Sequence, residues 1–137
     1  MRVFLLAGLL TLATTGVGFA ASCEQNFKSE GVPLVTAISY RSTQSFAGVK
    51  SSTALQRLAQ AVAAEGFSGI KINKQLASID AFQETTGSGR IQTLRVTARA
   101  QGKGTRVDAI FSIQAGQATS KSVVRDGLCR IIAAAAN

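Results

Sequence analysis

The chain has 137 residues, no histidine and two cysteines, and its fifteen lysines and arginines outnumber seven acidic residues to give a formal charge of +8. This length suits one domain with its own core and is too short for two. Without histidine the chain lacks the usual general base and the commonest neutral metal ligand, which excludes histidine-based triads and zinc sites. We predict no metal and no cofactor.

Residues 1–20 have the features of a secretory signal peptide. Arg2 supplies a positive start, an apolar stretch runs from Val3 to Leu12, and small residues follow up to Ala20. A membrane anchor is the alternative, but threonines and glycines leave the apolar run short of the ~20 residues that span a bilayer. Cleavage after Ala20 removes Arg2 and leaves 117 residues with a formal charge of +7, and we predict no stable transmembrane segment in this mature chain.

Cys23 is the third residue after this leader, and Cys129 lies near the other end of the chain. Because two cysteines usually pair in an oxidising compartment, we predict a Cys23–Cys129 disulfide in a periplasmic or secreted protein. A loop of this length stabilises the fold by about 4.7 kcal/mol in the chain-entropy model, and measured values are commonly 2 to 4 kcal/mol. The alternative is a lipoprotein acylated at Cys23, although Ala20 occupies the position where such signals usually have leucine.

The first predicted elements of the mature chain are a strand and a helix. The segment from Leu34 to Tyr40 follows Pro33, and both of its alternating sets of residues are mostly compatible with a strand, so we predict a strand there. A polar loop follows, and Ser51 or Ser52 then caps a helix that ends at Gly66. The apolar face of this helix has the expected spacing of three and four: Leu55, Leu58, Ala59 and Val62.

The second half of the chain reads as strands and a final helix. Residues 67–84 form either two short strands or one strand with a bulge, and residues 85–89 form a turn. Strict alternation over 94–100 and near-strict alternation over 107–113, joined by a glycine turn at 102–104, predicts a hairpin with one face in water. Thr119 or Ser120 caps the last helix, and Cys129 lies beside its apolar face.

These elements follow the order β-α-β-β-β-α in a single domain over residues 34–137, preceded by an N-terminal tail over 21–33. We expect an α+β fold, built as a two-layer sandwich in which an antiparallel sheet of about four strands carries two helices on one face. The other face of the sheet is then open and polar.

The candidate site residues lie on that open face. Arg95 and Arg99 share one side of a predicted strand, and Arg106 lies on its hairpin partner. One interpretation is an anion-binding patch made by these three arginines. The other is that their long side chains only cover the face and pair with Asp108, Asp80 or Glu84.

Acidic residues offer no catalytic pair. Asp80 and Glu84 share one side of a strand, but four residues separate them by ~13 Å, beyond the roughly 5 to 9.5 Å of glycosidase carboxylates. Asp108 could approach Asp80 across strands. We therefore predict a protein that is not an enzyme.

A pattern over about Leu34 to Ala135 resembles small bacterial envelope α/β domains, among them the helix-grip domains of the outer-membrane assembly lipoprotein C. The similar segments are EGF, GIKIN, SIDAF, GKGTRVDAIFSI and LCRII. The resemblance implies a non-enzymatic interaction module of the cell envelope and carries over no functional residue.

Two classes of function follow. The first is an exported binding or scaffold module whose partner is an envelope protein or an anionic envelope polymer or lipid, and not nucleic acid. The second is a secreted or periplasmic inhibitor or effector, a basic domain that occupies the acidic cleft of an enzyme.

Overall fold

The structure is a computed structural model that describes residues 21–84 and 89–137. The predicted signal peptide and most of the turn at 85–89 lie outside the described residues. Ten elements follow in chain order: α1 (Cys23–Asn26), β1 (Lys28–Glu30), β2 (Ile38–Phe46), α2 (Ser51–Ala64), β3 (Ser68–Asn73), β4 (Ser78–Glu84), β5 (Ile91–Gln101), β6 (Gly104–Ile113), α3 (Lys121–Ala133) and a 3₁₀ turn (Ala134–Ala136).

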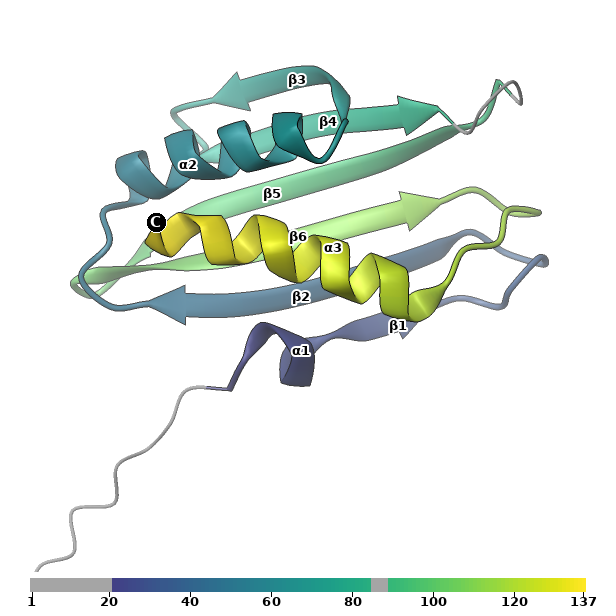
Figure 1. Ribbon diagram of the computed structural model, residues 1–137, viewed down its shortest axis with the longest axis horizontal. Helices are drawn as coiled ribbons and strands as arrows, with labels where there is room; N and C mark the ends of the chain where they lie inside the picture. The colour runs from purple at the N-terminus through teal and green to yellow at the C-terminus, as the bar shows by residue number, and fades with distance from the viewer. Residues whose placement is uncertain (1–20, 85–88) are drawn as a thin grey trace, which may run out of the picture.

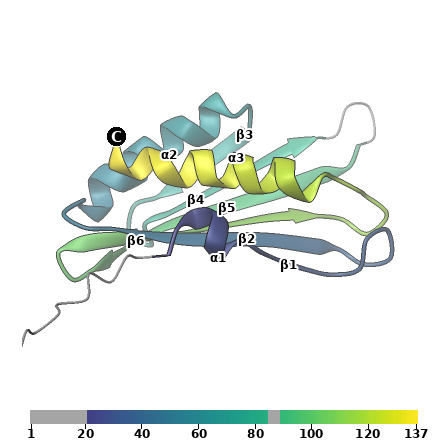
Figure 2. The ribbon, with the colours of Figure 1, turned by 60° about the horizontal axis from the view of Figure 1, so that its bottom comes forward.

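The strands form one antiparallel sheet of six strands in the order β1-β2-β6-β5-β4-β3. Both long helices, α2 and α3, lie on the same face of this sheet, as Figures 1 and 2 show. No described helix covers the opposite face, which we call the open face.

The expected sheet of about four strands with two helices is wrong, although the α+β class fits. The sheet has six strands and the described chain has three α-helices. Two additions come from α1 and β1, which lie within residues assigned to the tail and are too short, at four and three residues, to leave a periodic signal. The third comes from residues 67–84, which form two separate strands, β3 and β4.

The predicted strand Leu34–Tyr40 is also misplaced. Leu34 has φ = 68°, inside a turn, and β2 begins only at Ile38. It then continues to Phe46, through residues that had been assigned to a loop. Ser42 explains the error, because this polar residue is buried and its hydroxyl donates a hydrogen bond to the Cys23 carbonyl, so the inward face of β2 does not read as apolar.

The core lies between the sheet and the two helices. The predicted hairpin is present, since β5 pairs with β6 from Thr93–Ser112 to Gln101–Gly104. Arg130 Nε donates to Glu65 Oε1 over 2.8 Å and joins α3 to the end of α2. The side chains that are least exposed come from both layers: Leu58, Val62, Ile79, Val96, Val107, Ile113, Ile131 and Ile132.

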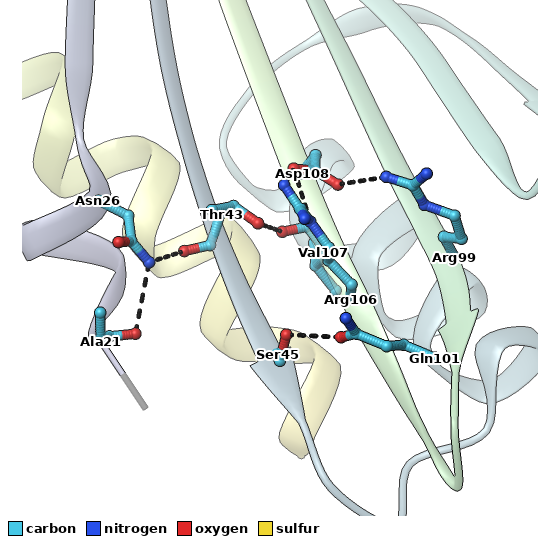
Figure 3. Close-up of polar contacts among 9 residues, drawn as sticks. All are labelled: Ala21, Asn26, Thr43, Ser45, Arg99, Gln101, Arg106, Val107 and Asp108. Carbon is cyan, nitrogen blue, oxygen red and sulfur yellow. Dashed lines mark hydrogen bonds and ion pairs between the residues drawn. The ribbon is translucent and has the colours of Figure 1, made fainter. Parts of the chain in front are cut away.

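The predicted disulfide is confirmed. Cys23 and Cys129 are bonded, with their Cα atoms 5.7 Å apart and 106 positions between them in sequence, and both are buried. The bond fastens α1 to α3. A hydrogen bond of 2.9 Å from Asn26 Nδ2 to the Thr43 carbonyl fastens the same segment to β2 (Figure 3). The N-terminal segment is thus attached to both layers of the fold.

Replacing both cysteines by serine should lower the free energy of unfolding by about 2 to 4 kcal/mol, because the unfolded chain loses its cross-link. Urea denaturation of the C23S/C129S variant and of the oxidised protein measures the difference. Reductant should lower the stability of the unsubstituted protein to a similar value and leave the variant unchanged. Equal stability of all three samples would contradict a stabilising role for the bond.

Candidate functional site

Strand alternation places all three candidate arginines on the open face. On β5, Arg95 and Arg99 are exposed, whereas the alternate residues Leu94, Val96 and Ala98 are buried beneath the helices. Arg106 alternates in the same way with the buried residues of β6. The structure therefore brings the three side chains to one surface of the molecule.

Arg95 is paired with a carboxylate from the neighbouring strand. It lies opposite Asp80 in the β4–β5 register, and its Nε is 2.6 Å from Asp80 Oδ1. The hydrogen bond to Asp80 and the negative charge of that carboxylate raise the pKa of Arg95 above its ordinary value, so this guanidinium stays charged. Both side chains are about half exposed, and such a pair adds little to stability.

Arg99 and Arg106 lie directly opposite each other in the β5–β6 register. Like charges in this position repel. The Asp108 carboxylate lies between them, with Oδ1 3.1 Å from Arg106 Nη2 and Oδ2 3.7 Å from Arg99 Nη2, as Figure 3 shows. The three candidate arginines therefore share two carboxylates and retain an excess of positive charge.

Three further cations lie on this face and were missed from sequence. The registers of all five strand pairs join into one row across the sheet, and Lys71, Arg41 and Lys28 belong to it. From β3 to β1 the row reads Lys71, Asp80, Arg95, Ile110, Arg41 and Lys28. We call it the basic row, because four of its six members are cations.

Lys28 and Arg41 were overlooked because they lay outside the predicted strands, in the assigned tail and just beyond Tyr40. The signal for Arg41 was its alternation with Ile38 and Tyr40, which continues the strand by one residue. Arg41 Nη2 lies 3.9 Å from Glu30 Oε2. Within residues 21–84 and 89–137, Lys28 makes no ion pair. Its nearest partner across the sheet is the like-charged Arg41.

Two shallow depressions bring these cations together. One of about 260 Å³ is lined by residues of β1, β2 and β6 that include Lys28, Arg41, Arg106 and Asp108. Another of about 550 Å³ lies across β3, β4 and β5 and includes Lys71 and Arg95. Both depressions therefore place cationic side chains around a surface open to solvent.

The chemistry available on this face is that of cationic hydrogen-bond donors. Asp80 and Asp108 lie on β4 and β6 with β5 between them, and each is engaged by arginine, so the two do not form a carboxylate pair. In the described part of the chain, no three residues among histidine, cysteine, aspartate and glutamate cluster as metal ligands do.

A wider groove of about 910 Å³ lies on the other side of the sheet, between α2 and β3. Its lining is mostly apolar or neutral and includes Leu55, Ile70 and Ile72, and Lys74 is its only charged residue. This groove shares nothing with the basic row and does not favour an anionic ligand.

No protein-family model matches this chain, and the curated proteins compared with it include no match. Among the helices of residues 21–84 and 89–137, none combines the length and apolar character needed to cross a membrane.

Replacing Asp108 by asparagine should lower the free energy of unfolding by about 0.2 to 1 kcal/mol, because Arg99 and Arg106 then face each other without a carboxylate between them. Salt should restore part of this loss by screening the repulsion. Urea denaturation at low and high ionic strength measures both effects. The D126N variant is the control, since it removes the same charge from α3, where Asp126 pairs with the adjacent Arg125. Equal, salt-independent losses in the two variants would contradict the role of Asp108.

Proposed function

We propose that this protein is a non-enzymatic binding module of the bacterial cell envelope, periplasmic or secreted, that holds an anionic envelope component against the open face of its sheet. The observation that carries the proposal is the basic row, in which four cations from four different strands are aligned across the sheet. A polymer or lipid that carries repeated negative charges is complementary to such a surface.

The disulfide supports the location. Cytosolic thiols are kept reduced, so a protein whose buried cross-link joins the two ends of its domain belongs in an oxidising compartment. The leader at residues 1–20 provides the route. The bond also uses the sulfur that acylation at Cys23 would require, which favours a periplasmic or secreted protein over a lipoprotein.

The ion pairs on the open face leave guanidinium donors available to a ligand. Arg95 contacts Asp80 through Nε, and arginine has five N–H donors, so the outer nitrogens of the guanidinium can still donate to a ligand. Arg106 donates to Asp108 Oδ1 through both Nε and Nη2, which leaves its Nη1 directed to neither oxygen of that carboxylate. Side chains that are already positioned lose less conformational entropy when they bind. The carboxylates thus orient the cations that the ligand contacts.

Neutralising three cations of the basic row as R41Q/K71Q/R95Q should weaken binding to immobilised polyphosphate by roughly threefold to a hundredfold, at about 0.2 to 1 kcal/mol per exposed contact. Binding is measured as the retained fraction against salt concentration. The control is K121Q/R125Q/R130Q, which removes the same charge from α3 on the helix-covered side of the sheet. If both variants lose the same affinity, binding reflects net charge and the open face is not the site.

The intact mass of the protein recovered from an expressing bacterium tests location and cross-link together. We expect a chain that begins at Ala21 and is lighter than the dithiol by the two hydrogens lost when Cys23 and Cys129 pair. Mass spectrometry with and without reduction measures both. A chain that begins at Cys23 and carries diacylglycerol would contradict the proposed location.

A further inference from the structure

The turn between β1 and β2, residues 31–37, presents apolar side chains to solvent. Val32, Leu34 and Val35 are 54%, 62% and 70% exposed. A single exposed apolar residue is ordinary, but three in one short turn are a candidate interaction site. Figures 1 and 2 place this turn at one end of the molecule. We call residues 31–37 the apolar turn.

Several backbone groups of the apolar turn are hydrogen-bonded within the turn. The Val32 N–H donates to the Thr36 hydroxyl over 2.8 Å, and the N–H groups of Val35 and Thr36 both donate to the Val32 carbonyl. The Thr36 hydroxyl donates in turn to the Ala37 carbonyl. Pro33 has no N–H, and these bonds reduce the number of N–H groups that would need water when the turn is covered.

The shape of the apolar turn is set by its backbone. Gly31 has φ = 122°, and a Cβ atom at this position would lie 2.3 Å from the Ala37 carbonyl oxygen. Leu34 adopts φ = 68°, in the left-handed region that leucine rarely enters. The three apolar side chains are therefore held outward before any partner arrives, and binding does not have to order them.

The same hairpin carries two members of the basic row. Lys28 on β1 and Arg41 on β2 lie opposite each other in register, and both are exposed on the open face. Glu30, the acidic residue nearest to the turn on β1, lies within 3.9 Å of Arg41. An apolar tip and a cationic stem thus occur on one hairpin.

We propose that this hairpin seats the protein on a lipid surface with anionic head groups. Val32, Leu34 and Val35 enter the boundary between head groups and acyl chains, and Lys28 and Arg41 contact the phosphates. The inference rests on the proposed function and names the anionic component as lipid. A hydrophilic polyanion would satisfy the cations but leave the apolar turn in water. A membrane surface has negatively charged head groups above a hydrocarbon layer. The cations and the apolar turn of the hairpin can contact these two layers at the same time.

A tryptophan placed in the turn reports entry into lipid, because the chain has no other tryptophan. The V35W variant should shift its fluorescence to the blue on mixing with vesicles of phosphatidylcholine and phosphatidylglycerol. The matched control is L76W, because Leu76 is also 70% exposed but lies in the β3–β4 connection at the other end of the strands. It should show no shift. Equal shifts at both positions, or none at either, would overturn the inference.

Removing the apolar side chains separates this inference from the proposed function. The V32S/L34S/V35S variant should bind these vesicles about tenfold more weakly or worse, since each lost side chain removes buried apolar area. It should retain its affinity for immobilised polyphosphate, and L76S should behave as the unsubstituted protein in both assays. Thermal unfolding confirms that the variants are folded. All use protein whose mass shows that residues 1–20 are absent.

Each result has one meaning. Unchanged vesicle binding by V32S/L34S/V35S overturns the lipid contact and leaves the proposed function intact. If the unsubstituted protein binds neither vesicles nor polyphosphate, both the lipid contact and the proposed function are overturned. A blue shift of V35W with soluble envelope proteins, but not with vesicles, overturns the lipid assignment in favour of a protein pocket.

Discussion

The disulfide between Cys23 and Cys129 is the constraint on which the basic row and the apolar turn depend. By itself β1 is a three-residue strand at a sheet edge, too short to hold its place through ladder hydrogen bonds alone. The cross-link fastens α1 to α3 immediately before β1 begins, so the start of the strand is already positioned when it pairs with β2. Lys28 and the apolar turn are therefore presented by a segment that the disulfide secures.

Elements of the fold that leave a repeating pattern in the sequence could be predicted. The β5–β6 hairpin followed from strict alternation on both sides of a glycine turn, and the two long helices followed from apolar residues spaced by three and four. Pairing of the cysteines followed from their number and the leader. Each of these signals is local or needs no knowledge of which strands are neighbours.

What could not be predicted depends on tertiary contacts. β1 has no periodic pattern, and β2 was displaced because Leu34 alternates as a strand would but occupies a turn. Ser42 is buried where its hydroxyl donates a hydrogen bond to the Cys23 carbonyl. The two residues are 19 positions apart, so no local sequence pattern reveals this contact. The basic row was missed for the same reason, since its members become neighbours only when the register of all six strands is known. The three predicted arginines lie on the open face, as expected. The position of the Asp108 carboxylate between Arg99 and Arg106 was not predicted.

The carboxylates of the open face have a structural role beyond neutralisation. Asp80 and Asp108 lie among the cations of this face, and the pairs that they make fix the directions of three guanidinium groups. Without Asp108, two arginines forced opposite each other would turn apart. A basic surface can thus contain acidic residues that hold its cations in defined positions.

The two edges of the sheet have a consequence for molecules gathered at high density. At one edge β1 offers only three residues. At the other, β3 is interrupted by a bulge between Ser68 and Lys71, and the Phe82 ring lies over Gly69 where a side chain would otherwise stand. Short, irregular and lysine-bearing edges resist pairing with a strand from another copy. Copies of the protein gathered at high density on one surface would therefore stay separate and would not join edge to edge into a continuous sheet.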